Sequence, residues 1–159
     1  MSQDARFEDG VARPLRLRAE DVEDLSVLSS LVQDAVLPAN EMRWERSKRR
    51  FSCLINRFRW EDKAVAERQG RGFERVQALL VIGDVMHVSQ QGLDQRGADM
   101  VLSLLSLVFA PGEDGTGRLE LTFAGDGAVA LDVETLSIVL QDVTRPYVSN
   151  AGAAPSHPD

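Results

Sequence analysis

Hydrophobic and polar positions alternate with a period of two through most of the chain, which predicts a protein built largely from β-strands. The alternation is clearest in residues 118–123 and 129–133, on either side of Gly125-Asp126-Gly127. Glycine and aspartate tolerate the positive φ angles of a tight turn, so two alternating runs joined by these residues predict a β-hairpin.

Six further segments predict strands by alternation or by a short apolar run. They are 15–18, 42–44, 49–60, 76–82, 85–88 and 99–109. Segment 49–60 carries apolar residues on both faces, which is typical of a strand that is covered on two sides. Segment 99–109 fits either a strand or a buried helix, and the strands and loops around it favour a strand.

Two segments change to a helical period. Residues 20–35 carry an apolar stripe behind an acidic start, and acidic side chains complement the positive end of a helix. Residues 134–142 have a shorter stripe, whereas 61–72 is predicted to be a charged loop. The expected fold is therefore α+β, with about seven antiparallel strands forming a bent sheet or small barrel between one N-terminal helix and one C-terminal helix. This element order resembles that of pleckstrin-homology barrels.

Length and composition predict one domain that is not stabilised by internal disulfide bonds. A chain of 159 residues can bury a core of ordinary size, and the single cysteine excludes an internal disulfide. Residues 14–147 are predicted to form the domain, between a polar N-terminal arm (1–13) and a C-terminal tail (148–159). The start of the sequence has no apolar run of signal-peptide length, and no window is apolar enough to span a bilayer. We therefore expect a cytoplasmic protein that does not bind membranes.

The sequence contains no recognisable catalytic or metal-binding motif, so no catalytic residue, metal or cofactor is assigned. The two histidines, His87 and His157, are 70 residues apart, which gives no metal-ligand spacing. Cys53 lies in the middle of a predicted strand, where a small buried thiol is the ordinary interpretation. A small enzyme that uses Cys53 or His87 stays an alternative.

Charge is distributed unevenly along the chain. The total is −7, but residues 43–75 contain 11 basic and 5 acidic side chains, a net of +6, and aromatic residues lie between the basic ones. Arginine beside aromatic side chains suits an acidic or phosphorylated ligand or a protein partner. The leading hypothesis is a non-enzymatic binding module, whose predicted binding residues are Trp44, Arg49, Arg50, Arg57, Arg59, Trp60 and Arg71.

Three other interpretations of this basic stretch remain open. Its aromatic residues can belong to the core, with the arginines on a solvated face paired to the acidic helix. Single-stranded nucleic acid would also suit arginine and aromatic side chains, but the overall acidity argues against it. The chain can also form a homo-oligomer, in which the acidic helix of one subunit meets the basic strand of another.

Several short segments resemble a known family. They are the stretch from Pro14 to Asp21, Asn56-Arg57-Phe58-Arg59-Trp60-Glu61, Phe123-Ala124-Gly125-Asp126-Gly127 and Leu131-Asp132-Val133-Glu134. Together they resemble a small alphaproteobacterial family that is catalogued only as a domain of unknown function. The resemblance covers about residues 14–147. It implies a single-domain cytoplasmic protein, often encoded near histidinol dehydrogenase, and it implies no reaction and no catalytic residues.

Overall fold

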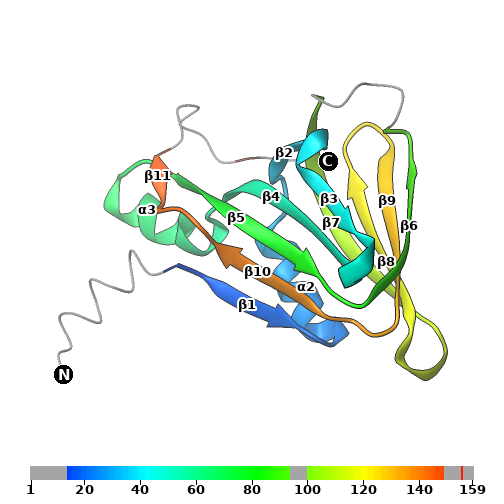
Figure 1. Cartoon of the computed structure of the whole chain (residues 1–159). Helices are drawn as coiled ribbons and strands as arrows, with labels where there is room; N and C mark the ends of the chain where they lie inside the picture. Colours follow the sequence, from blue (N-terminus) through cyan, green and yellow to red (C-terminus); the bar gives the residue numbers. More distant parts are fainter. Residues whose placement is uncertain (1–13, 94–99, 149–154, 156–159) are drawn as a thin grey trace.

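A single, mostly antiparallel sheet with two α-helices makes up the described part of the chain (Figure 1). The computed structural model describes residues 14–93, 100–148 and 155. The helices are α2 (Val22–Leu31) and α3 (Lys63–Gln69). The strands are β1 (Arg16–Ala19), β2 (Val36–Pro38), β3 (Met42–Glu45), β4 (Arg50–Phe58), β5 (Glu74–Ile82), β6 (Val85–Gln91), β7 (Val101–Pro111), β8 (Gly117–Phe123), β9 (Gly127–Val133), β10 (Ile138–Asp142) and β11 (Tyr147–Val148).

The sheet is open rather than closed into a barrel. Its strands follow the path β1-β10-β5-β4-β2-β7-β8-β9-β6, and β3 and β11 pair beside this path with β4 and β5. The expected α+β class and antiparallel sheet are confirmed, but the described chain has eleven strands instead of about seven. Of the two expected forms, a bent sheet or a small barrel, the barrel is wrong because the sheet is not closed, and the path gives no basis for a pleckstrin-homology-like order.

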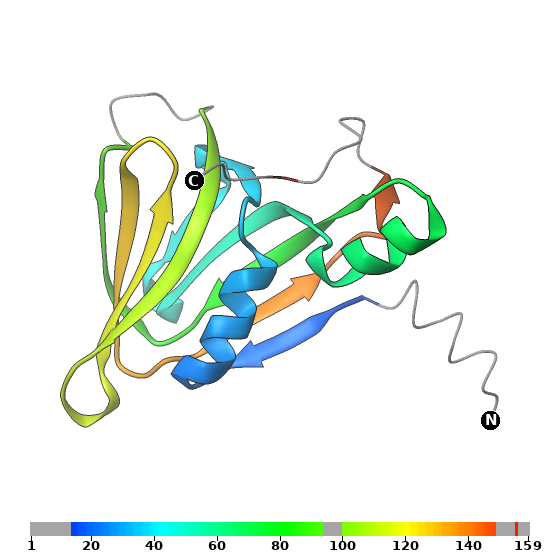
Figure 2. The same cartoon turned by 180° about the vertical axis from the view of Figure 1, so that it is seen from behind.

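The core lies inside the curve of the sheet. Strands β4 and β5 contribute buried side chains such as Ile55 and Leu80 from one half, and β8 and β9 contribute Leu121 and Leu131 from the other. Burying each of these side chains contributes roughly 1.5–3 kcal/mol. Helix α2 packs against β7 and β1, and Figure 2 shows it lying alongside the sheet next to β7.

Helix α2 confirms the predicted N-terminal helix, although it is shorter than 20–35. Asp21 caps its start in an extended conformation, where its side chain accepts a hydrogen bond of 2.8 Å from the backbone N–H of Asp24. The helix ends at Leu31, and Asp34 takes a positive φ of 65° and donates its backbone N–H to Leu104 O on β7. This backbone pairing of Asp34 with β7 therefore ends the helix, although the apolar stripe of the sequence continues to residue 35.

Helix α3 corrects the prediction of a loop at 61–72. Residues 63–69 are mostly good helix formers, and Gly70 closes the helix with a φ of 65°. Only Ala66 is buried, so the segment lacks the apolar stripe that identifies most helices. High charge density and a small apolar face are typical of a loop, so the pattern did not predict this helix.

The predicted C-terminal helix at 134–142 is wrong, because this segment forms β10. Ile138, Leu140 and Asp142 are buried on one face and pair with β5, and β1 pairs along the other edge. The segment contains both a helical and a two-residue period, and the unpaired edge of β5 decides between them. Tertiary pairing thus overrides the local pattern.

The segment predicted at 99–109 contains a strand, as favoured, and this strand, β7, extends from Val101 to Pro111. The remaining difference in strand number comes from β2 and β11, which have three and two residues and are too short to show alternation. Strand β11 includes Val148, so the described fold continues to that residue. The predicted arm 1–13 and most of the tail lie outside the described residues.

Candidate functional site

The seven predicted binding residues separate into two groups at opposite ends of β4. One group gathers where the strand ends: Arg57, Arg59, Trp60 and Arg71. The other group lies where the strand begins: Trp44, Arg49 and Arg50. A strand of nine residues spans about 30 Å, so the two groups do not form one surface.

Arg57 is fully buried, and its guanidinium uses all five of its N–H donors within the protein. Nε and Nη2 donate to the two carboxylate oxygens of Asp142 on β10, each at 3.0 Å. Nη1 and Nη2 donate to Glu61 at 2.9 and 2.7 Å, and Nη1 also lies 3.4 Å from Phe58 O. Asp142 additionally accepts the backbone N–H of Leu15 at 3.0 Å. Arg57 therefore joins β4, β10 and the start of β1 and is not accessible to a ligand.

Two more arginines extend this buried arrangement. Arg71 donates two hydrogen bonds to the Asp62 carboxylate, at 2.7 and 2.8 Å, and Arg59 bonds Glu74 and lies 3.7 Å from Asp62. The Arg59 Nε makes no hydrogen bond within the described chain, but it lies 3.8 Å from Glu61. The arginines and carboxylates form one charge cluster: Arg57, Arg59, Arg71, Glu61, Asp62, Glu74 and Asp142.

The charge cluster neutralises its own arginines. Three guanidinium groups meet four carboxylates, which leaves a net charge of −1. Paired and buried guanidinium groups hold an added anion poorly, because the anion would have to displace carboxylates that are fixed in place. The cluster therefore ties strands together, and the partners of its arginines are not the acidic residues of the N-terminal helix.

The arginines of the cluster keep its carboxylates ionised. Burial opposes the charged form of Glu61, but the hydrogen bonds from Arg57 outweigh that effect and hold the pKa of Glu61 below its usual value. The hydrogen bonds from Arg71 likewise lower the pKa of Asp62. Both carboxylates are therefore charged at neutral pH, and their attraction to the arginines is fully present there.

We expect the free energy of unfolding to fall as the pH drops below about 4, where Glu and Asp protonate in the unfolded chain. The lowered pKa values of Glu61 and Asp62 mean that the folded state releases protons more readily than the unfolded state. Their contribution is complete above the unfolded pKa and is lost as the pH falls through the folded pKa. Urea unfolding between pH 7 and pH 2.5 measures this loss, and Glu61→Gln should show a shallower decline. An equal decline in that variant would contradict the assignment.

An aromatic cluster lies beside the charge cluster. Phe58 is 1% exposed, and its ring meets Trp60 edge-on at 4.7 Å and Phe73 at 5.7 Å. Trp60 donates its indole N–H to Gln33 O at 3.0 Å, and the Arg75 guanidinium lies 6.0 Å above the Phe58 ring. These aromatic side chains hold the connection between α2 and β2 against β4. Their position agrees with the alternative interpretation in which the aromatic residues of the basic stretch belong to the core.

The second group, by contrast, lies beside an open groove. Trp44 is half-buried and, together with Met42, borders a cavity of about 390 Å³ between β3 and β6. Phe51 and Val129 lie beneath it, and Val88, Ser89 and Gln90 line its far side. Within the described chain β3 pairs only with β4, and β6 pairs only with β9. We call this cavity the β3–β6 groove, because each of the two strands borders it and keeps one unpaired edge.

Basic side chains are concentrated next to the β3–β6 groove. Residues 41–50 contain five basic and two acidic side chains, a net of +3. Arg49 pairs with Glu134 at 2.8 Å and Arg50 with Glu45 at 3.1 Å, but both arginine side chains are more than 40% exposed. Exposed pairs of this kind contribute about 0–1 kcal/mol, so a ligand can replace them. Arg43 and Arg46 are exposed and make no ion pair among the residues that the structure describes.

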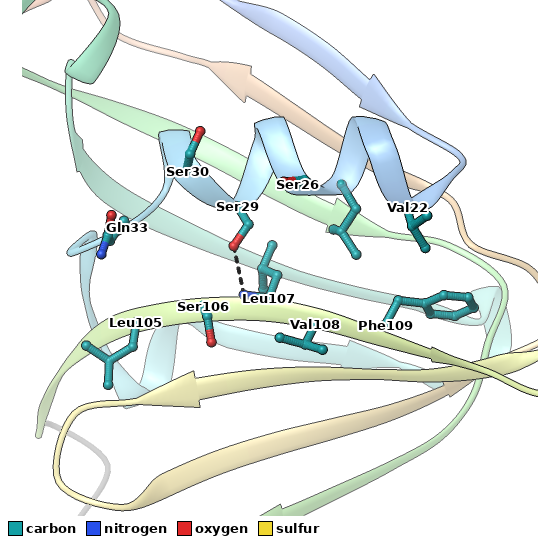
Figure 3. Close-up of a pocket in the computed structure, with 11 residues that line it drawn as sticks. Val22, Ser26, Ser29, Ser30, Gln33, Leu105, Ser106, Leu107, Val108 and Phe109 are labelled. Carbon is teal, nitrogen blue, oxygen red and sulfur yellow. Dashed lines mark hydrogen bonds between the residues drawn. The ribbon is translucent and has the colours of Figure 1, made fainter.

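A second groove lies between α2 and β7 (Figure 3) and encloses about 450 Å³. Three hydroxyls and an amide from one face of α2 and the turn after it line one wall: Ser26, Ser29, Ser30 and Gln33. The β7 wall is mostly apolar, with Leu105, Leu107, Val108 and Phe109. This site was not predicted from the sequence, although the 26-29-30-33 spacing places the four polar side chains on one helix face.

Of the two candidate catalytic side chains, Cys53 does not lie in a catalytic setting. Cys53 is 2% exposed, and burial raises the pKa of its thiol to about 12. His87 is exposed on β6 opposite Asp132. A catalytic thiol has to ionise near neutral pH, so the pKa of Cys53 argues against the alternative in which this residue is the nucleophile.

We expect iodoacetamide to leave Cys53 unmodified in the native protein at pH 7.5, because the thiol is both protonated and buried. Labelling should become rapid when urea unfolds the chain. Mass spectrometry of the alkylated protein measures both rates, with free glutathione as the reference thiol. Rapid labelling without urea would contradict the buried position.

No group of three His, Cys, Asp or Glu residues in the described ranges is arranged to hold a metal ion. Among the described helices, none is long and apolar enough to cross a membrane.

The fold and its two grooves define an α+β protein with an open antiparallel sheet and a buried charge cluster. The chain belongs to the family described as "Protein of unknown function (DUF2948)", whose pattern matches residues 15–157. The predicted resemblance to a family known only as a domain of unknown function is therefore confirmed, whereas the bacterial group and the gene neighbourhood stay predictions. No curated protein and no solved structure matches the chain.

Proposed function

We propose that this protein is a non-enzymatic interaction module that binds an acidic, extended segment of a partner protein in the β3–β6 groove. The observation that carries the proposal is the pair of unpaired strand edges on either side of a groove lined by Trp44 and flanked by arginines. Of the seven residues predicted from the sequence, this proposal keeps Trp44, Arg49 and Arg50 and leaves the other four in structural roles.

The backbone of β3 and β6 supplies the affinity in this proposal. An extended peptide can add to an exposed strand edge through main-chain hydrogen bonds, while alternate side chains enter pockets beside the strand. The apolar base formed by Phe51 and Val129, with Trp44 at the side, offers such a pocket. Tryptophan is also enriched among the residues that contribute most to protein interfaces.

The basic side chains near the groove favour a peptide of negative charge. Residues 41–50 carry +3 in a chain that carries −7 overall, so this region attracts an acidic segment while the rest of the surface repels it. Breaking the exposed pairs of Arg49 and Arg50 costs little, and Arg43 and Arg46 need no such exchange. An acidic peptide can therefore gain several charge-assisted hydrogen bonds at once.

The test uses a fluorescein-labelled peptide of four Glu-Val repeats, capped at both ends, and fluorescence anisotropy. We expect binding that weakens at least about tenfold in Trp44→Ala and in Arg46→Glu, which corresponds to about 1.4 kcal/mol or more. Arg145→Glu is the matched charge reversal outside the groove and should leave the affinity unchanged. Equal binding by Trp44→Ala, or preferential binding of a single-stranded oligonucleotide, would overturn the proposal.

A further inference from the structure

We propose that the groove between α2 and β7 is a second binding site, which takes an extended basic peptide as an additional strand beside β7. The two proposals are independent, since this groove shares no lining residue with the β3–β6 groove and is flanked by charges of the opposite sign. Four observations carry the proposal: an unpaired strand edge, backbone groups aimed into the groove, a mixed polar and apolar lining, and acidic side chains at one end.

The first observation is that β7 loses its neighbour partway along. On one edge it pairs with β2 only from Val101 to Ser103, and the backbone of Leu104 then bonds Asp34 and Ala35. On the other edge β8 pairs with it from Leu104 to Pro111. From Leu105 onward, β7 therefore has no described strand on the α2 side, and Figure 3 shows the helix running beside this edge.

The second observation concerns the direction of the backbone groups on that edge. The N–H of Leu107 donates to Ser29 Oγ on α2 at 3.1 Å, so Leu107 directs its backbone groups away from β8. Alternate residues of a strand direct their backbone groups to the same side, which places the N–H and C=O of Phe109 on the groove side too. Outside the strand ladders, no backbone hydrogen bond in the described ranges involves these two groups. A peptide strand would pair with Phe109 through both of them.

The lining of the groove suits an extended peptide. Ser26 and Ser30 are exposed hydroxyls one helical turn apart. Ser30 already donates to Val27 O at 2.7 Å and can still accept a hydrogen bond, whereas Ser26 can donate and accept. At the Phe109 end the lining becomes apolar, where Val22 and Val108 are more than half exposed. Gly117 on β8 leaves room for the Phe109 ring, because a Cβ there would collide with this ring and lie 2.6 Å from Ala110 O. The ring is thus positioned at the groove by the strand behind it.

The charge at the Phe109 end selects a basic peptide. Residues 20–24, beside Val22, contain four carboxylates, of which Asp21 caps the helix and Glu20 lies 3.6 Å from Arg18. Glu23 and Asp24 are exposed and make no ion pair within the described chain. Of these two side chains, Glu23 lies at the edge of the groove face of α2 and Asp24 on the opposite face of the helix. A lysine or arginine near the end of a bound peptide would be attracted to Glu23, with Asp24 adding only to the local negative field, whereas an acidic peptide would be repelled.

The experiment uses a fluorescein-labelled peptide of four Lys-Val repeats, capped at both ends, with a Glu-Val peptide of equal length as the comparison. We expect the Lys-Val peptide to bind and Ser26→Trp, which fills the groove, to weaken it at least about tenfold. Val27→Trp places the same side chain on an exposed position of α2 that does not line the groove, and it should bind normally. Glu23→Gln with Asp24→Asn should weaken binding and reduce its dependence on salt.

A second measurement changes the peptide instead of the protein, so it does not depend on whether a protein variant folds. A Lys-Val peptide with methyl groups on alternate backbone nitrogens cannot donate the hydrogen bonds along one of its edges. We expect this peptide not to bind, although its side chains are the same as those of the unmethylated peptide. Equal affinity for the methylated peptide, for the Glu-Val peptide or for Ser26→Trp would overturn the proposal. Self-association of the chain alone that Ser26→Trp abolishes would also overturn it, because the occupant would then be a second copy. Trp44→Ala should not change Lys-Val binding, so the two grooves are tested separately.

Discussion

Replacing Arg57 by methionine is expected to lower the free energy of unfolding by about 3–5 kcal/mol, which is a large part of the stability of an ordinary domain. Methionine fills much of the same space, so the loss comes from charge and hydrogen bonding. Asp142 is 5% exposed and would lose both of its guanidinium donors. A carboxylate left buried without a cation is costly, because water can no longer reach it. Urea denaturation followed by circular dichroism measures the change.

Two further variants separate this explanation from a general loss of packing. Arg118→Met removes an arginine from an exposed pair with Asp132 and should change the free energy of unfolding by less than about 1 kcal/mol. Adding Asp142→Asn to Arg57→Met removes the stranded charge and keeps an acceptor for the Leu15 N–H, so it should restore part of the stability. A loss below about 1 kcal/mol for Arg57→Met would contradict the structural role of the charge cluster.

The sequence contains a signal that places Arg57 inside, although its basic neighbourhood suggested a surface. Phe51, Cys53 and Ile55 follow a two-residue period within the segment that was predicted to be a strand, and Arg57 continues the same period. All four are buried. The partner that makes burial possible, Asp142, is 85 residues away on a strand that was expected to be a helix. Periodicity predicts the direction of the side chain, but only tertiary pairing identifies the carboxylate that neutralises it.

Long strands with a clear period were predictable, and short or ambiguous segments were not. Strands β8 and β9 alternate without interruption, and their hairpin follows from local chemistry alone. Strand β10 has five residues and is stabilised by β5 and β1, neither of which is close to it in sequence. The open sheet itself depends on which edges find a partner. Local sequence does not encode that choice, so a small barrel and an open path were equally compatible with the pattern.

The residues of the two grooves were likewise only partly predictable from local sequence. Trp44 was predicted as a binding residue from its basic surroundings, but its position opposite β6 depends on how the sheet curves. The four polar residues on α2 and the turn after it were visible as one helical face, yet the wall they complete belongs to β7, more than 70 residues later. Residue type and spacing therefore identify side chains that can take part in a site. The fold decides which of these side chains meet.

Replacing Phe58 by alanine is expected to lower the free energy of unfolding by about 3–5 kcal/mol. Its side chain is 1% exposed and contacts the rings of Trp60 and Phe73, so removal leaves a cavity at the point where β4 meets the start of α3. The loss of stability includes the edge-on contact between Phe58 and Trp60. The charge cluster lies next to this position, because Arg57 of the cluster contacts the backbone carbonyl of Phe58. Thermal and urea unfolding of the variant measure the effect.

Trp44→Ala provides the matched comparison, because it also removes an aromatic side chain from the basic stretch. Trp44 is half-buried beside an open groove, so the surrounding side chains and water can occupy the vacated space more easily than at Phe58. We expect its loss of stability to be less than half that of Phe58→Ala, and its main effect to fall on binding of the acidic peptide. The opposite ranking would place Trp44 in the core and Phe58 at a surface. In that case the interaction site would have to be moved to the other end of β4.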